Sequence, residues 1–409
     1  MKKFSFEILA EEDQTRLGRL ETLHGTIETP AFVPVATQGT VKSLSGADLS
    51  TIGTQVLITN AYHLHLQPGE EIISRMGGLH RFMGWEGPIM MDSGGYQVFS
   101  LGMGKKYGGS KIHSPVSKLR DQDGQCGSKK GKSLVTVTEE GVDFTSYRDG
   151  SMHRFTPEYI VQTGRSLGVD MIMVLDECTS PLHNHRETEV SMERTHRWAI
   201  KALAEFYGHP SNGQSLFGII QGGAYPDLRE KSARFIARQP FHGFAIGGYL
   251  GQSKKEMSQV LQWTLPYLPQ DKPRHFLGIG LVEDVFEMVS QGIDLFDCIA
   301  PTRLASTGTF FTRKGRRFRL RILNEAFKND PRPVEADCGC YACRHHSRAY
   351  LRHLFLAREP LAPVLAGLHN LYFMESLMKE IREAIREGNF KSLREAWMAT
   401  ERSKIETPS

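Results

Sequence analysis

An aspartate that interrupts an apolar run is the first residue of this sequence with the means to do chemistry. Asp297 lies within the run LFDCIAPTR (295–303). A carboxylate there loses the solvation that water would supply, so its ionised form needs partners or a function. Taken alone, Asp297 would fit a strand with one face in water. Several carboxylates and an amide at successive run ends are instead typical of an active site. Polar residues or glycines end other apolar runs in the same way: Asn60, Asp92, Asp176, Gln221, Gly247, Gly248 and Gly278.

Three closely spaced cysteines form a second group with chemical potential. Cys338, Cys340 and Cys343 lie in CGCYAC (338–343), and in a reducing compartment this spacing indicates a metal rather than disulfides. Three such thiolates can share one tetrahedral zinc ion, which then needs a fourth ligand. Without an obvious open position, the site is expected to be structural. Spacing leaves four histidines open as the fourth ligand: His345, His346, His353 and His369.

Seven short apolar runs provide the strands that must position these side chains. Their hydrophobicity is continuous rather than alternating, which suits parallel strands covered on both faces. The segments between them space apolar residues three and four apart, as amphipathic helices do, so the sequence predicts an α/β fold. The runs occupy residues 55–63, 88–97, 171–177, 216–223, 243–248, 275–280 and 295–301.

The position of the polar residues favours a (β/α)8 TIM barrel. They end their runs, and a barrel gathers the carboxyl ends of its strands around one pocket. A dinucleotide-binding sheet is the weaker choice because no run is followed by a G-x-G-x-x-G turn. We therefore expect a barrel core over 1–311, interrupted by a flexible basic insertion over 102–133. A zinc-binding subdomain over 312–370 and C-terminal helices over 371–409 that complete the barrel would follow.

Composition adds weaker constraints. The 409 residues carry 50 Lys and Arg against 46 Asp and Glu, and this mildly basic balance permits a polyanionic partner without requiring one. The lysines of 102–133 and the basic stretch TRKGRRFRLR (312–321) would suit phosphate contact, or they are solvated surface. No apolar run approaches the roughly 20 residues of a membrane span. Acids stand near the N-terminus where a secretory signal would be apolar, so we expect a cytoplasmic protein with no membrane partner.

Seven sequence blocks occur in the order found in one known enzyme family. They are MDSGGYQVFS, VLDEC, IIQGG, FAIGG, LFDCIAPTR, CGCYACR with SRAYLRHL, and LHNLYFM. On these blocks the chain resembles the tRNA-guanine transglycosylases (queuine tRNA-ribosyltransferases), of the bacterial type without a C-terminal PUA domain. The resemblance implies a TIM barrel with an inserted zinc-binding subdomain near the C-terminus.

The resemblance also implies a reaction. The wobble guanine of tRNAs with a GUN anticodon would be replaced by a 7-deazaguanine base, as a step of queuosine modification, without cutting the RNA backbone. Asp297 would attack the ribose C1′ and give a covalent RNA-enzyme ester. Asp92 would act as acid and base, and two successive displacements predict retained configuration at C1′. Apart from structural Zn²⁺, no cofactor would be needed.

Base recognition and metal binding follow from the same resemblance. Asp176 would accept hydrogen bonds from guanine N1 and the exocyclic amine, while Gln221 and the Gly248 N–H would bind the carbonyl side. Tyr96 and Leu277 would sandwich the ring, and Arg303 would contact RNA. The remaining base-site residues would be Ser93, Gly94, Gly95 and Gly247, and the zinc ligands would be Cys338, Cys340, Cys343 and His369.

Two positions depart from the family pattern. Ser306 stands where an RNA-contacting arginine is usual, and the lysines of 102–133 would supply the missing charge. Gly251 stands where bacterial enzymes carry valine, in a segment that lacks their glutamate. A roomier wall at Gly251 slightly favours the bulky base queuine over 7-aminomethyl-7-deazaguanine.

The main alternative is a catalytically silent RNA-binding subunit of the same family. A silent subunit would be free to lose Asp92 or Asp297, and both are present, so the enzyme is the stronger hypothesis. A barrel nucleosidase acting on free nucleosides is more distant, because the zinc module and the basic C-terminal part would have no use there. The expected partners are a tRNA with a U-G-U anticodon-loop element, a free deazaguanine base and a second copy of the chain in a homodimer.

Overall fold

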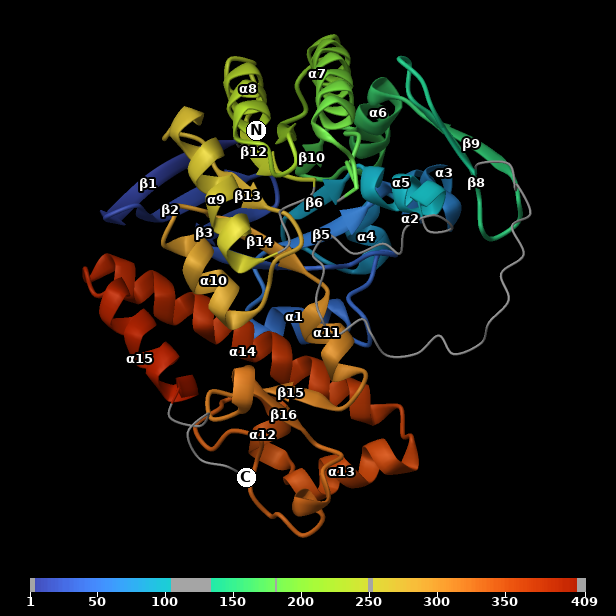
Figure 1. Cartoon of the computed structure of the whole chain (residues 1–409). Coiled ribbons are helices and arrows are strands. Elements are labelled where there is room, and N and C mark those ends of the chain that lie inside the picture. The colour runs from blue at the N-terminus through green and yellow to red at the C-terminus, as the bar shows by residue number, and fades with distance from the viewer. Residues whose placement is uncertain (1–3, 104–133, 181, 249–252, 403–409) are drawn as a thin grey trace.

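An eight-stranded parallel barrel forms the centre of the protein (Figure 1). The structure is a computed structural model that describes residues 4–103, 134–180, 182–248 and 253–402. Parallel pairing runs through the whole sheet, and a bridge between Val35 and Ile58 closes the first strand against the second. The TIM barrel expected from the sequence is confirmed. Its strands are β4 (Ala31–Pro34), β5 (Leu57–Asn60), β6 (Ile89–Asp92), β10 (Met171–Met173), β11 (Ser215–Ile220), β12 (Gly243–Ile246), β13 (Arg274–Phe276) and β14 (Leu295–Cys298).

The strands are shorter than the apolar runs that predicted them, because each run continues into the loop or helix that follows. The first strand, β4, was missed. It has only four residues, Ala31–Pro34, which follow Pro30 and end in Pro34, and proline inside an apolar run argues against a strand. It is tolerated here because Pro34 is the last residue of β4.

Helices surround the barrel and follow its strands in alternation (Figure 1). Their ends carry the expected signals: Asn184 and Glu187 form a capping box at the start of the longest of these crossover helices. The helices that follow the strands are α1 (Gly46–Ile52), α2 (Ala61–Leu66), α3 (Glu70–Arg75), α4 (Leu79–Met83), α5 (Gly95–Met103), α6 (Pro157–Leu167), α7 (His185–Tyr207), α8 (Pro226–Ala237), α9 (Lys254–Thr264), α10 (Val282–Val289) and α11 (Ala300–Ala305), with a 3₁₀ turn at Leu265–Tyr267.

Two small antiparallel sheets are added to the barrel. β1 (Ser5–Glu12), β2 (Thr15–Thr22) and β3 (Gly25–Thr29) cover the N-terminal ends of the strands, where Arg16 forms a buried ion pair with Asp294 just before β14. The second sheet comprises β7 (Val135–Val137), β8 (Val142–Thr145) and β9 (Met152–Phe155) and lies between α5 and α6 in the chain. Neither sheet was predicted from the sequence.

The C-terminal part forms a separate layer below the barrel in Figure 1. It has its own small apolar core, which includes Phe310, Leu351 and Leu365. α14 contacts α1, β1, β2 and β4, so it serves as the last helix of the barrel. The elements are β15 (Thr309–Phe311), β16 (Arg319–Arg321), α12 (Tyr341–His345), α13 (Arg348–Ala357), α14 (Leu361–Arg386) and α15 (Phe390–Arg402), with 3₁₀ turns at Arg316–Phe318 and Glu325–Phe327.

Two sequence-based expectations fall outside the described residues. They concern nearly all of the basic insertion 102–133 and the loop position Gly251. Among the helices that the structure describes, none combines the length and apolar character needed to cross a membrane.

Candidate functional site

A cavity of about 290 Å³ opens at the carboxyl ends of the barrel strands. Its three carboxylates and the Asn60 amide come from the ends of β5, β6, β10 and β14, which is the end of the barrel where the sequence predicted the site. The lining residues are Val35, Thr37, Ile58, Thr59, Asn60, His63, Asp92, Tyr96, Gln97, Asp176, Cys178, Leu277, Asp297 and Ile299.

Asp297 lies in β14 with its side chain 15% exposed. Its Oδ1 accepts a hydrogen bond from the Gly278 N–H at 3.1 Å and lies 2.9 Å from Nε2 of the fully buried His275. Among the residues described, no hydrogen bond or ion pair reaches Oδ2. The carboxylate is therefore fixed through one oxygen, which leaves the other for the cavity.

The thiol of Cys298 follows Asp297 directly and is a poor competitor as a nucleophile. Burial raises the pKa of Cys298 to about 11, so the thiol stays protonated at neutral pH. Its Sγ accepts a hydrogen bond from the Ala300 N–H at 3.3 Å.

Asp92 ends β6 and is joined to the neighbouring strand. Nδ2 of Asn60 donates to Asp92 Oδ2 at 2.7 Å, and Asn60 Oδ1 caps α2 by accepting from the His63 N–H. One buried amide therefore orients the carboxylate and starts a helix. Gly94 follows with φ 82°, where a Cβ would come within 2.5 Å of Tyr62, so the loop after Asp92 requires glycine at this position.

Asp176 is buried and held from three directions. Gln221 Nε2 donates to its Oδ2 at 2.5 Å, Cys178 Sγ lies 3.3 Å from the same oxygen, and Ser93 Oγ lies 3.5 Å from Oδ1. Gly95 packs against the same aspartate, since a Cβ there would lie 2.6 Å from the Asp176 carbonyl oxygen. The strands β6, β10 and β11 thus meet at this carboxylate.

Gln221, Gly247 and Gly248 stand behind Asp176 and do not line the cavity that the described residues form. Gln221 is completely buried, and its Oε1 has no hydrogen-bond partner among the described residues. A Cβ on Gly248 would come within 2.1 Å of that oxygen, and the φ of 79° at this position also favours glycine. The buried guanidinium of Arg229 donates to the Gly247 carbonyl at 3.0 Å and supports the pair of glycines from below.

Tyr96 and Leu277 reach the cavity from opposite sides. Tyr96 lies in α5, after β6, and Leu277 follows β13, four strands away in either direction around the barrel. Arg303 lies in α11, exposed and outside the cavity wall. Ser306, the position that departs from the family pattern, ends α11 and donates through Oγ to the Arg303 carbonyl at 2.8 Å.

A second site is formed where Cys338, Cys340 and Cys343 meet His369 of α14. His369 Nδ1 lies 3.7, 3.4 and 3.3 Å from the three sulfur atoms in that order. In a tetrahedral zinc site, bond lengths near 2.3 Å to sulfur and 2.05 Å to nitrogen place these atoms about 3.6 Å apart. The separations therefore fit one metal ion shared by four ligands.

The other nitrogen of His369 fixes the ring for this role. Nε2 lies 2.7 Å from the Phe311 carbonyl oxygen, so it carries the proton and leaves the Nδ1 lone pair directed at the thiols. Spacing had left four histidines open. His345, His346 and His353 are not part of the cluster, whereas His369 is, although it lies 26 residues beyond Cys343 in the chain.

Sequence reasoning assigned no role to the residues that hold the site residues in place. His275, Asn60, Cys178 and Arg229 contact the carboxylates or glycines described above. Asn60 was noted as the polar end of an apolar run, but its contact with Asp92 was not predicted. His275 and Arg229 give no local signal, because His275 lies inside a short strand and Arg229 inside an ordinary amphipathic helix.

Comparisons with known proteins agree with this arrangement. A family model described as queuine tRNA-ribosyltransferase matches residues 12–403. A queuine tRNA-ribosyltransferase of Roseiflexus sp. (strain RS-1) is 44% identical over 406 residues, covering 97% of this chain and 98% of that protein. One from Herpetosiphon aurantiacus is 42% identical over 400 residues, covering 98% of this chain and 93% of that protein. The chain is therefore a member of the queuine tRNA-ribosyltransferase family and, as such, a tRNA-guanine transglycosylase.

Proposed function

We propose that this enzyme replaces the wobble guanine of GUN-anticodon tRNAs with a 7-deazaguanine through a covalent intermediate on Asp297. The observation that carries the proposal is the state of the Asp297 carboxylate. His275 and Gly278 hold Oδ1, whereas Oδ2 has no partner among the described residues in the cavity wall. A nucleophile that is oriented through one oxygen can attack with the other at no cost in reorganisation.

Two displacements at the ribose C1′ make up the reaction. In the first, Asp297 Oδ2 bonds to C1′ as the bond from C1′ to guanine N9 breaks, and the leaving base takes up a proton. In the second, the incoming base loses its proton from N9, attacks C1′ and releases the aspartate. Asp92, held by Asn60, would deliver and accept these protons. Two inversions give net retention at C1′.

The incoming and leaving bases would share one recognition site. Asp176 would accept hydrogen bonds from guanine N1 and the exocyclic amine, and Tyr96 and Leu277 would contact the two faces of the ring. Gln221 and the Gly248 N–H would bind the carbonyl side after a small rearrangement, because Gln221 is occupied with Asp176 here. Such a site rejects bases that leave its buried polar groups unpaired. The accepted deazaguanine would be queuine or its 7-aminomethyl relative.

The Cys338, Cys340, Cys343 and His369 cluster would hold a structural zinc ion. All four positions of a tetrahedron come from the protein, so no open position remains for substrate. Zinc would supply the cross-link that holds the small C-terminal core to α14, while the exchange chemistry stays with the carboxylates of the barrel.

Transfer of labelled base tests the proposed function directly. The protein is incubated with radiolabelled guanine and a tRNA whose anticodon loop contains U-G-U, beside a matched tRNA that contains U-A-U. Label is expected in the first RNA only. Label in neither RNA would contradict the proposal and favour a catalytically silent RNA-binding subunit.

His275 offers a prediction about orientation of the nucleophile. Replacing His275 with alanine removes a hydrogen bond to a charged oxygen, a contact worth about 1.5–3 kcal/mol, so kcat is expected to fall by about 10- to 100-fold. His275→Gln retains a donor and should recover much of the loss. Steady-state exchange assays on both variants, with thermal melting to confirm folding, check this. Equal kcat values in His275→Ala and the parent would contradict it.

A further inference from the structure

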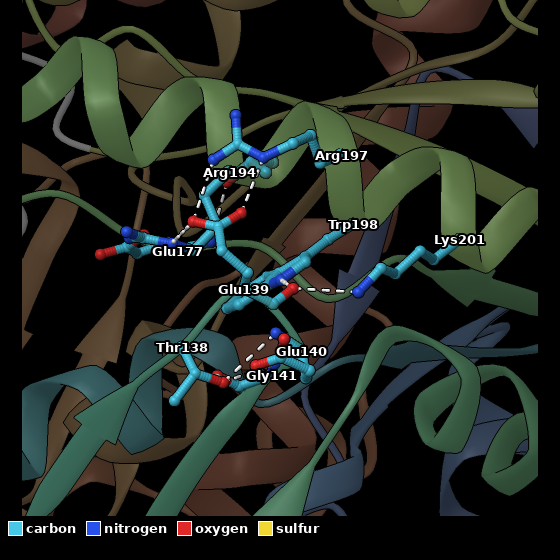
Figure 2. Close-up of polar contacts among 10 residues, drawn as sticks. Thr138, Glu139, Glu140, Gly141, Glu177, Arg194, Arg197, Trp198 and Lys201 are labelled. Carbon is cyan, nitrogen blue, oxygen red and sulfur yellow. Dashed lines mark hydrogen bonds and ion pairs between the residues drawn. The ribbon is translucent and has the colours of Figure 1, made fainter.

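Among the described residues, every hydrogen bond between the β7–β8 turn and α7 involves Glu139 (Figure 2). Its carboxylate accepts two hydrogen bonds from Arg197, at 2.7 and 3.0 Å, and one from Arg194 Nε at 3.0 Å. Its carbonyl oxygen accepts from Trp198 Nε1 and Lys201 Nζ, each at 3.0 Å. The turn is therefore docked on α7 by side chains from two successive turns of that helix.

Arg194 differs from the other residues that bind Glu139 because it also contacts a buried carboxylate. While Nε bonds to Glu139, Nη1 pairs with the carboxylate of Glu177 (Figure 2). The side chains of Arg194 and Glu177 are only 17% and 12% exposed, whereas those of Glu139 and Arg197 are each 50% exposed. Among the described residues, Arg194 is the one cation that forms an ion pair with Glu177. Arg194 thus links a surface carboxylate to a buried one.

Glu177 directly follows Asp176, the buried aspartate of the cavity. Two adjacent residues of α7 hold Glu177. Arg194 forms the ion pair with its carboxylate, and Thr195 Oγ1 accepts a hydrogen bond from its backbone N–H at 3.0 Å. On the other side, Gln221 holds the Asp176 carboxylate. Contacts from α7 therefore fix the backbone at Glu177, and Gln221 at the end of β11 orients the Asp176 carboxylate.

We propose that Arg194 is a positioning residue for base recognition, which holds Glu177 in place and so sets the geometry of the adjacent Asp176. This inference rests on the proposed function, in which Asp176 binds the base. It predicts that base affinity depends on a side chain that touches neither base nor RNA in the described site.

The cost of losing Arg194 follows from burial. Without it, the Glu177 carboxylate stays buried and loses its cation, which a charged group tolerates poorly. The ionised Glu177 carboxylate then moves toward water, and this movement displaces Asp176, which is joined to Glu177 through the backbone. Loss of Arg197 frees only an exposed carboxylate, which water solvates. Arg197 is therefore the matched control, since it shares Glu139 but does not touch Glu177.

Steady-state kinetics with guanine at saturating tRNA separate the two roles. Arg194→Gln is expected to raise KM for guanine about tenfold or more with kcat within about twofold, since binding is lost equally in ground and transition states. Arg197→Gln should leave KM within about twofold, since exposed pairs contribute little. Adding Glu177→Gln to Arg194→Gln removes the uncompensated charge and should return KM to within about threefold of the parent. Equal KM values in the two single variants, or no recovery in the double variant, would overturn the inference.

Hydrogen–deuterium exchange of the protein without tRNA gives a second readout that needs no catalysis. Peptides covering 174–180 should exchange faster in Arg194→Gln than in the parent and remain unchanged in Arg197→Gln. If the parent exchanges no base, the proposed function and the role in base recognition fall together. An active parent, with unchanged KM and unchanged protection in Arg194→Gln, overturns the inference alone.

Discussion

Replacing Asp297 with asparagine is expected to reduce base exchange by at least about 10⁴-fold, the scale on which enzymes lose activity when a nucleophile is removed. Asparagine has nearly the same size and can still contact His275 and Gly278, so the fold should not change. It cannot form the ester with C1′. The measurement is the rate of label transfer from guanine to tRNA for parent and variant at equal protein concentration.

The covalent intermediate gives this prediction an independent check. The parent, mixed with tRNA and no incoming base, should yield an RNA-protein adduct that survives denaturing electrophoresis. Asp297→Asn should yield none. Asp92→Asn is the matched control, because it changes another cavity carboxylate and leaves the nucleophile, so an adduct should still form, although more slowly. Exchange by Asp297→Asn within tenfold of the parent would rule out this nucleophile.

Removal of the metal is expected to have the second largest effect, on stability rather than on chemistry. Structural zinc sites bind with about 10–16 kcal/mol in small domains, which is comparable to the whole stability of many proteins. Purified protein should contain one zinc per chain by elemental analysis. Stripping it with a strong chelator should unfold the small core around Phe310, Leu351 and Leu365, seen as loss of amide protection over 309–360.

Histidine variants provide the control for this experiment. His369→Ala should lose zinc and the same protection, because His369 is completely buried with its Nδ1 against the three sulfur atoms. His353→Ala should keep both, since His353 is exposed and outside the cluster. Full zinc content in His369→Ala, or a protein whose amide protection survives the chelator, would contradict a structural role for the metal.

The barrel could be predicted from the sequence because its strands are buried on both faces. Continuous apolar runs such as LFGII in β11 mark these strands without any knowledge of partners. β4 was missed because it contains a proline. β7, β8 and β9 were missed because alternation over only three or four residues is too short a signal to predict a strand. Apolar patterns in the sequence therefore identify strands that are buried on both faces, but they do not identify strands as short as these.

For the candidate site as well, some features could be predicted from the sequence and others could not. Asp92, Asp176 and Asp297 could be expected to lie together because each ends a run, and they do line one cavity. Contacts that depend on strands meeting in space, such as His275 with Asp297, could not be read from spacing along the chain. The ion pair of Arg194 with Glu177 joins residues 17 apart through the packing of a helix on a loop. Such pairs can be identified only from the three-dimensional structure.

The position of His369 has a consequence for how the chain is made. α14 carries this residue of the cluster and also packs on α1, β1, β2 and β4, so the barrel is completed by a helix that is synthesised after all eight of its strands. The three cysteines precede α14 in the chain, so the proposed metal ion could have all four ligands only after α14 has been synthesised. A newly made chain without the proposed zinc ion would therefore complete its barrel but leave the small core around Phe310, Leu351 and Leu365 without its cross-link to α14.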